Sequence, residues 1–579
     1  MTATERRAVP RPRRVDTTEG VVQFDAPVVI GTTEEKATPV VGLFETLLER
    51  EIDDRVVRAD EGTEPDVRLT IDDRPSSEFD DPEGYVLETD DDTVTIRAST
   101  VDGLRYGCQT VVTALTVRDD HDRPVFPAGE IHDWPATSWR GFMLDPARGF
   151  LPVDRVKRRI DQAARAKLNR LHLHLLDDES YALESEAHPE LNRDSDGTEH
   201  PAYSSADVAE LVDYAGRRGI KIVPEIDMPA HARHILETYP ELQCTVEDGD
   251  ASERTICLGN RETIEFVETL LEEVIERFPF DVVHIGGDEW EMLGHSWDEC
   301  VDCRAKMAAD GSETATEHFY AFVRHIHEFL EEHDRRTTLW NDQIDISESP
   351  DLPRDVTIQF WRVAGPGRGP IEGCSMARFL EEEFDVVNSY VHAAYVNGWI
   401  TEEYVLGWEP KRRPSVPENR EERVLGGELL AWEPSDEPAR EYFERALPSA
   451  IPVFADRLWN GAPITDHSSF SRALTRHTLG PYLPDGFDIY RELGGTILPT
   501  DWKRSDPSLP AHANRSLGDR TPREAVAEYE AAIETLSALR EAEETVYPET
   551  ADAYVDCLEW LVEVAERDGR GVIDRPWEQ

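Results

Sequence analysis

Residues 281–290, Asp-Val-Val-His-Ile-Gly-Gly-Asp-Glu-Trp, decide how the chain is interpreted. An apolar, β-branched run is typical of a buried strand, and this one stops at two glycines, which let the backbone approach another group closely. Asp288 and Glu289 follow at once. Because side chains alternate across a strand, we expect the two carboxyl groups to point in different directions and meet different environments. The stretch predicts a buried strand that ends in a reactive site rather than a solvated acidic loop.

The same pattern, an apolar strand followed by polar or aromatic residues, recurs along the chain. Eight strand candidates alternate with helical stretches, at residues 140–145, 169–177, 221–227, 281–289, 337–342, 357–361, 385–390 and 424–432. About eight such units is the count of a TIM barrel, in which the C-terminal ends of the strands carry the active site. The chain therefore predicts the α/β class and a (β/α)8 barrel with one polar mouth.

Composition and periodicity divide the chain into four segments. Residues 1–20 are rich in Arg, Pro and Thr and predict a disordered arm. Residues 21–136 alternate strands with two helices and hold no clustered chemistry, so they predict an α+β support domain. Residues 137–462 contain the barrel. Residues 463–579 are amphipathic and predict a C-terminal helical extension that packs on the barrel or mediates dimerisation, which leaves the oligomeric state open.

The charge balance excludes some classes of protein. Asp and Glu number 120 against 61 Lys and Arg, for a net charge of -59, which argues against a nucleic-acid partner. Hydrophobic residues still make up 39% of the chain, so we expect a folded protein of a halophilic archaeon, where salt shortens the screening length to ~3 Å at 1 M. There is neither an apolar run of ~18 residues nor the apolar core of a signal peptide, so we expect a cytoplasmic protein without a membrane partner.

The seven cysteines offer one alternative site. Cys300 and Cys303 form a C-x2-C pair that could bind zinc together with Cys244 and Cys257. The spacing of the other two cysteines is too loose to be specific. We therefore expect reduced thiols in loops, and no metal.

The chain resembles the family 20 glycoside hydrolases, the β-N-acetylhexosaminidases. The resemblance covers about residues 20–460 and rests on an ordered set of segments: RGFMLDPAR, KLNRLHLHLLDDES, GIKIVPEIDMPAH, CLGNRETIEF, HIGGDEW, YVN and ERALPSAIPVFADRLW. It implies exo-acting removal, with retention, of a terminal β-linked GlcNAc or GalNAc from a small oligosaccharide or glycoside. In such substrate-assisted families the 2-acetamido oxygen of the sugar acts as the nucleophile, and the resemblance implies no cofactor.

The resemblance also implies roles for individual residues. Glu289 is the general acid that then becomes the base for water, and Asp288 stays ionised beside the acetamido N–H and the positive intermediate. Tyr395 bonds the acetamido carbonyl. The residues implied to surround the sugar are aromatic walls at Trp340, Trp361 and Trp432, a gripping arginine at Arg148, supporting residues at Asp177 and His231, and polar positions at Asn397 and Glu433.

The chain departs from the family pattern at two places. Ala230 stands where the family usually has glycine before His231. The sequence Trp432-Glu433-Pro434 replaces the expected W-x-E. The carboxylate that binds the distal hydroxyls of the sugar is therefore missing or displaced to Glu433. The preference between gluco and galacto substrates therefore stays open.

Two other functions remain as alternatives. A non-catalytic sugar-binding protein could keep the barrel without turnover, and the altered W-x-E position is its best support. A metal-dependent barrel hydrolase could use His284, Asp288 and cysteine ligands. The second is disfavoured because no other histidine lies at metal-ligand spacing from His284.

Overall fold

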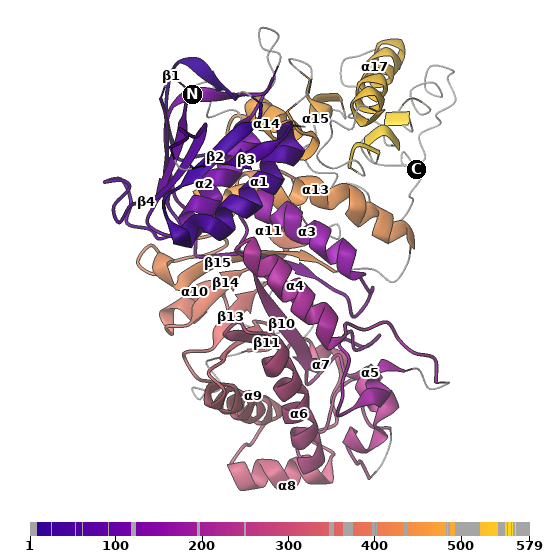
Figure 1. The fold of residues 1–579 in the computed structure, drawn as a ribbon. Coiled ribbons are helices and arrows are strands. Elements are labelled where there is room, and N and C mark those ends of the chain that lie inside the picture. The colour runs from indigo at the N-terminus through magenta and orange to yellow at the C-terminus, as the bar shows by residue number, and fades with distance from the viewer. Residues whose placement is uncertain are drawn as a thin grey trace.

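The computed structural model contains a closed barrel of eight parallel strands, preceded by a smaller α/β domain (Figure 1). It describes residues 8–492, 522–541 and 550–562, apart from residues 25, 53, 61, 91, 117–122, 194–196, 248–249, 345, 347–351, 363–373, 397–399, 401, 433–436, 482, 484–486, 553, 557 and 560–561.

Every strand predicted for the barrel is found in it. The strands close in the order β10-β11-β12-β13-β14-β15-β8-β9, and β15 pairs with β8 from Gly426–Trp139 to Ala431–Leu144. They are buried almost throughout, as expected for strands covered on both faces. Their bounds are β8 Trp139–Leu144, β9 Arg170–His174, β10 Lys221–Met228, β11 Val282–Gly286, β12 Arg336–Trp340, β13 Thr357–Phe360, β14 Asp385–Asn388 and β15 Val424–Ala431.

Helices connect these strands around the outside of the barrel. Long amphipathic helices such as α6 and α9 bury their apolar residues against the strands, while shorter ones lie in the loops at the mouth. Their bounds are α3 Val153–Arg165, α4 Ser205–Arg217, α5 Arg233–Thr238, α6 Arg261–Arg277, α7 Trp290–Leu293, α8 Val301–Asp310, α9 Ala315–Glu332, α10 Met376–Glu381, α11 Val391–Ala394, α12 Glu402–Leu406 and α13 Glu437–Asn460.

The first domain is a seven-stranded sheet in the order β1-β7-β5-β6-β4-β2-β3. Helices α1 and α2 pack on the sheet and also contact the barrel helices α4 and α3, so they lie between the two domains. The bounds are β1 Arg14–Gln23, β2 Val28–Thr32, α1 Thr38–Ile52, β3 Val56–Arg58, β4 Val67–Ile71, β5 Tyr85–Thr89, β6 Val94–Ala98, α2 Val101–Ala114 and β7 Val125–Asp133.

The prediction of a disordered arm over residues 1–20 is wrong for residues 8–20. Strand β1 pairs antiparallel with β7, and only Val15 and Val22 are buried in it, so its charged and Thr-rich sequence hides the strand pattern. Just before β1, the Arg11 guanidinium forms an ion pair of 2.8 Å with the buried Asp456 of α13. This segment therefore ties the first domain to the end of the barrel.

Buried ion pairs join the domains elsewhere as well. Nη1 of Arg140, in β8, lies 2.8 Å from Oε2 of Glu83, and Nζ of Lys167 lies 2.9 Å from Oδ2 of Asp133. Removing one partner of such a pair leaves a buried charge alone, which is strongly destabilising. These pairs therefore hold the first domain against the barrel.

Beyond the barrel, the chain continues in helices. α14 His467–Leu479 packs against α13, and α15 Ile489–Glu492 contacts both α14 and α17 Pro522–Glu541. In the view of Figure 1, α14 and α15 lie between the first domain and α17. In the residues that the structure describes, no helix combines the length and the apolar character that crossing a membrane requires.

Candidate active site

The two adjacent carboxylates follow a sharp turn at the end of β11. Gly286 has φ +69°, and a Cβ atom there would lie 1.7 Å from Oδ1 of Asp227, so only glycine fits. The N–H of Gly287 donates to the same oxygen at 3.2 Å. The expectation that strand alternation turns Asp288 and Glu289 apart is wrong, because the strand ends at Gly286 and Glu289 has a left-handed φ of +53°.

His231 faces both carboxylates. Its Nε2 atom lies 3.7 Å from Oδ2 of Asp288 and 3.6 Å from Oε2 of Glu289. Its Nδ1 atom lies 3.1 Å from Oδ1 of Asp177, which holds the ring in place. The structure thus brings together four residues that the sequence analysis had singled out from three separate barrel loops.

The environment of Asp288 opposes its ionisation. Burial is the largest cause that raises the pKa of Asp288, the attraction of His231 opposes it, and the charges of Asp342 and Glu289 add to it, so the pKa reaches about 7. Burial opposes a charge on His231, but the carboxylates of Asp288 and Asp177 outweigh it and raise the pKa of the imidazole well above its usual value. In the described part of the chain, Oδ1 of Asp288 has no hydrogen-bond partner. Asp288 therefore offers an acceptor to a donor or cation placed in the mouth.

Asp342, just beyond the end of β12, supports Glu289 from the other side. Its Oδ2 accepts the backbone N–H of Glu289 at 3.1 Å and Nη2–H of Arg362 at 2.9 Å. Nη1 of Arg362 lies 3.8 Å from Oε1 of Glu289. Arg362 was not among the site residues predicted from the sequence, although it directly follows Trp361 at the aromatic end of a predicted strand.

Four aromatic rings lie together at the mouth. The ring centroids of Trp361 and Tyr395 are 5.6 Å apart, those of Tyr395 and Trp432 6.1 Å, and those of Trp432 and Trp340 5.8 Å. Trp340 is buried and donates Nε1–H to Oε1 of Glu225 at 2.7 Å, whereas Trp361 and Trp432 are half-buried. Such amphipathic walls suit the C–H faces of a pyranose ring.

Arg148 lies at the edge of this wall. Its guanidinium contacts Oδ2 of Asp145 at 2.9 Å and Oδ2 of Asp177 at 2.5 Å, and its carbon Cζ lies 4.8 Å from the ring centroid of Trp432. The two carboxylates fix the orientation of the planar Arg148 guanidinium, which suits this group to binding sugar hydroxyls. Asn397 and Glu433, the other two predicted contacts, lie outside the described residues, as does Pro434.

A second set of buried charges fills the inside of the barrel. Glu225 contacts Nε2 of His172 at 3.1 Å, Nδ1 of His284 at 2.9 Å, and His174; Glu428 contacts Nδ1 of His172 at 3.1 Å. Burial opposes the ionisation of Glu225, but the histidines outweigh it and hold its pKa well below the usual range. The expectation that no other histidine lies at metal-ligand spacing from His284 is wrong in space, since the His172 ring centroid is 4.8 Å away. Burial opposes a charge on His172 and His174, but the nearby carboxylates raise the pKa of both, so these two histidines form ion pairs. Burial lowers the pKa of His284, which favours its neutral form.

Comparisons with known proteins show the family of the chain. Residues 138–462 match the model of the glycosyl hydrolase family 20 catalytic domain, and residues 5–134 match that of glycosyl hydrolase family 20, domain 2. The chain belongs to glycosyl hydrolase family 20.

Family 20 relatives align over most of this chain. The beta-hexosaminidase of Porphyromonas gingivalis is 27% identical over 500 residues, covering 80% of this chain and 62% of that protein. The beta-N-acetylhexosaminidase of Cellulomonas fimi is 27% identical over 497 residues, covering 81% and 93%. The exo β-N-acetylglucosaminidase of Vibrio harveyi, solved with N-acetylglucosamine, has a TM-score of 0.69 at 23% identity and covers 82% of this chain and 76% of that one. This likeness of structure supports the fold.

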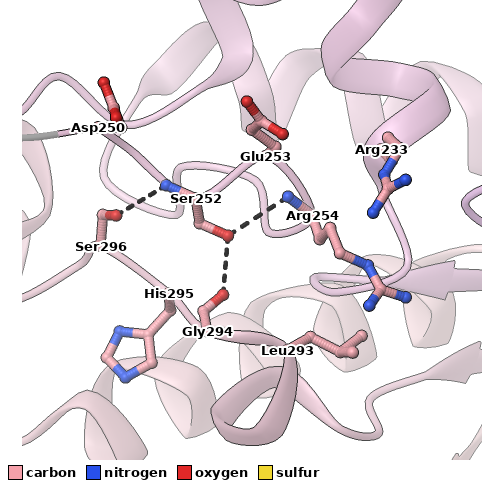
Figure 2. A pocket seen from close by; sticks show the side chains of 9 residues that line it. All are labelled: Arg233, Asp250, Ser252, Glu253, Arg254, Leu293, Gly294, His295 and Ser296. Carbon is pink, nitrogen blue, oxygen red and sulfur yellow. Dashed lines mark hydrogen bonds between the residues drawn. The ribbon is translucent and has the colours of Figure 1, made fainter.

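Beside the catalytic mouth of this family 20 barrel lies a shallow polar pocket of about 360 Å³ (Figure 2). The N–H of Leu293, one of its residues, donates to the carbonyl of Glu289 at 2.8 Å, so the pocket adjoins the pair Asp288 and Glu289. None of the predicted site residues lines it. Its lining comes from the loops after β10 and β11: Arg233, Asp250, Ser252, Glu253, Arg254, Leu293, Gly294, His295 and Ser296.

Proposed function

We propose that this chain is an exo-acting, retaining β-N-acetylhexosaminidase that removes a terminal GlcNAc or GalNAc by substrate-assisted catalysis. The observation that carries the proposal is the convergence of Asp288 and Glu289 on one nitrogen of His231. In most retaining glycosidases the two carboxylates flank the sugar from opposite sides. Two carboxylates that meet at one imidazole nitrogen lie on the same side, so the nucleophile has to come from elsewhere.

The 2-acetamido group of the substrate can supply that nucleophile. Its carbonyl oxygen attacks C1, the glycosidic bond breaks, and the leaving oxygen takes the proton of Glu289. Oδ1 of Asp288 accepts the acetamido N–H and its charge stabilises the oxazolinium-like intermediate, while the Tyr395 hydroxyl donates to the acetamido oxygen. Glu289 then removes a proton from water, which attacks C1 and reopens the ring. Two inversions at C1 give net retention.

A pair of matched substrates tests the proposal. Purified protein in concentrated KCl should hydrolyse p-nitrophenyl β-N-acetylglucosaminide, whereas p-nitrophenyl β-glucoside, which lacks only the acetamido group, should turn over at least ~10³-fold more slowly. Comparable rates on the two substrates would show that the acetamido group is not the nucleophile. Folded protein that binds N-acetylglucosamine but releases no nitrophenol at any pH would favour the non-catalytic sugar-binding alternative.

We also infer that the protein works in a salt-rich cytoplasm on short oligosaccharides or glycosides. The net charge of -59 supports adaptation to salt, because bound or screening cations relieve the repulsion between carboxylates. The thermal midpoint of unfolding should be clearly higher in about 3 M than in about 0.1 M KCl, because at high ionic strength the screening length falls to a few ångströms. Equal midpoints would contradict the adaptation to salt.

A further inference from the structure

Four buried cysteine sulfurs meet between the loops that follow β10 and β11. Cys244 and Cys257 belong to the first loop, and Cys300 and Cys303 to the second. All four Sγ atoms lie within 4.8 Å of one another. The separations are 3.6 Å for Cys257–Cys300, 3.6 Å for Cys257–Cys303 and 3.9 Å for Cys244–Cys303. These are the four cysteines considered above as possible zinc ligands, and the expectation of thiols without a metal rested on the loose spacing of Cys244 and Cys257.

The separations match the geometry of one tetrahedral ion. Thiolates bind zinc at ~2.3 Å, so the sulfurs around a single zinc ion are ~3.8 Å apart. A disulfide would bring two of the sulfurs to ~2.05 Å. An iron–sulfur cluster places several irons and inorganic sulfides between its cysteines and needs more room.

We propose that Cys244, Cys257, Cys300 and Cys303 bind one structural zinc ion as thiolates. Four protein ligands complete the tetrahedral shell and leave no position for water or substrate, which is typical of a structural rather than a catalytic zinc. The four thiols lose their protons on binding, and the ion carries no redox step. This site is separate from the catalytic pair.

The surrounding backbone fits such a site. The N–H of Gly259 hydrogen-bonds the sulfur of Cys257, the kind of outer contact that orients a metal ligand. A Cβ atom on Gly259 would lie 2.2 Å from the backbone nitrogen of Cys303, so the two cysteine-bearing turns pack directly against each other. All four cysteines are buried, with Cys244, at 6%, the most exposed.

The ion fastens the two loops that flank Glu289. Ser252 and Thr255, on the first loop, both donate side-chain hydroxyls to the carbonyl of Gly294 on the second, at 2.8 and 2.7 Å (Figure 2 shows the Ser252 bond). The second loop begins at α7, directly after Glu289. Zinc therefore orders the outer wall of the mouth without contacting the substrate.

The metal content of the purified full-length chain tests the proposal directly. Protein prepared without chelator should contain one zinc per chain by plasma mass spectrometry. Cys257→Ser and Cys303→Ser should each lose most of it, and Cys374→Ser, which changes a half-buried cysteine outside the cluster, should retain it. Folded wild-type protein with far less than one zinc, or with one iron in its place, would overturn the assignment.

A second measurement needs no variant. A mercurial reagent added to the wild-type protein should release one zinc to a chromogenic chelator, and protein made with cobalt should show the thiolate-to-cobalt absorption of a tetrahedral site. Thiol titration in denaturant should find all seven cysteines reduced. Two disulfides among the four, or cobalt without thiolate absorption, would contradict the proposal.

Discussion

The barrel holds two groups of buried carboxylates whose environments are opposite. Inside the barrel, the attraction of histidines outweighs burial and lowers the pKa values of Glu225 and Glu428. At the mouth, burial dominates and raises the pKa values of Asp227, Asp288 and Asp342. Asp177 is the exception there, because burial is outweighed by Arg148 and His231, which lower its pKa. The interior acids are therefore charged and paired, while Asp227, Asp288 and Asp342 are held among like charges with too little compensation.

The two environments correspond to two roles: the interior carboxylates stabilise the fold, and the carboxylates at the mouth are suited to catalysis. A buried carboxylate that is already paired with protonated histidines helps to hold the barrel together. A further positive charge beside it would add little stabilisation. A buried carboxylate short of compensation is stabilised most by a positive charge that appears in front of it, which is what an oxazolinium-like intermediate provides. Substitutions at the interior carboxylates should therefore lower mainly stability, and substitutions at the mouth should lower mainly activity.

Glu289→Gln should have the largest effect on activity and little effect on stability. The variant cannot donate a proton to the leaving oxygen, so kcat on an alkyl glycoside should fall by about 10³–10⁴-fold. On a nitrophenyl substrate, whose leaving group needs little protonation, the loss should be much smaller. Equal losses on the two substrates, measured by single-turnover release of sugar, would contradict the assignment of Glu289 as the acid.

Asp288→Asn should come next, with a loss of kcat of about 10²–10³-fold. The amide keeps the volume but removes the charge opposite the intermediate. Because it also removes a buried charge among like charges, the thermal midpoint should stay level or rise. A neutral effect on kcat would make the substrate-assisted scheme wrong, and a large drop in the midpoint would place Asp288 with the interior acids.

Much of this comparison could be predicted from the sequence, and the rest depends on contacts between distant loops. The barrel strands were predictable because each is a short apolar run with polar residues after it, and Asp288 and Glu289 were found because they are neighbours in sequence. Strand β1 was missed because its exposed face is charged. The pairing of Glu225 with His172 was missed because only barrel closure brings the two residues together.

Glu225→Gln should lower stability more than catalysis. Removing the charge leaves buried histidines without their counter-ion, and the free energy of unfolding should fall by about 3 kcal/mol. The matched variant Glu428→Gln, which loses only the contact with His172 among these histidines, should cost less. Denaturant unfolding of both variants measures the difference, and a Glu225→Gln protein of unchanged stability would break the comparison.

The same variant should show a characteristic pH dependence. Burial opposes the charge of His172, but Glu225 and Glu428 raise its pKa from the ordinary 6.5 to about 9. A raised pKa in the folded state gives stability that is fully present below about 6.5 and is lost as the pH rises through about 9. The gap in stability between wild type and Glu225→Gln should therefore narrow above about pH 9.

The smallest expected effect is a shift in the pH profile of kcat/KM. Asp288 acts as a carboxylate, and because burial first and then Asp342 and Glu289 raise its pKa to about 7, activity of the free enzyme should fall below about pH 7. Asp342→Asn removes one of the neighbouring charges while its side-chain carbonyl can still accept from the Glu289 N–H, so this acidic limb should move to lower pH. A limb that stays in place would mean that a different group controls it, and the like-charge environment of the mouth would then not govern the ionisation of Asp288.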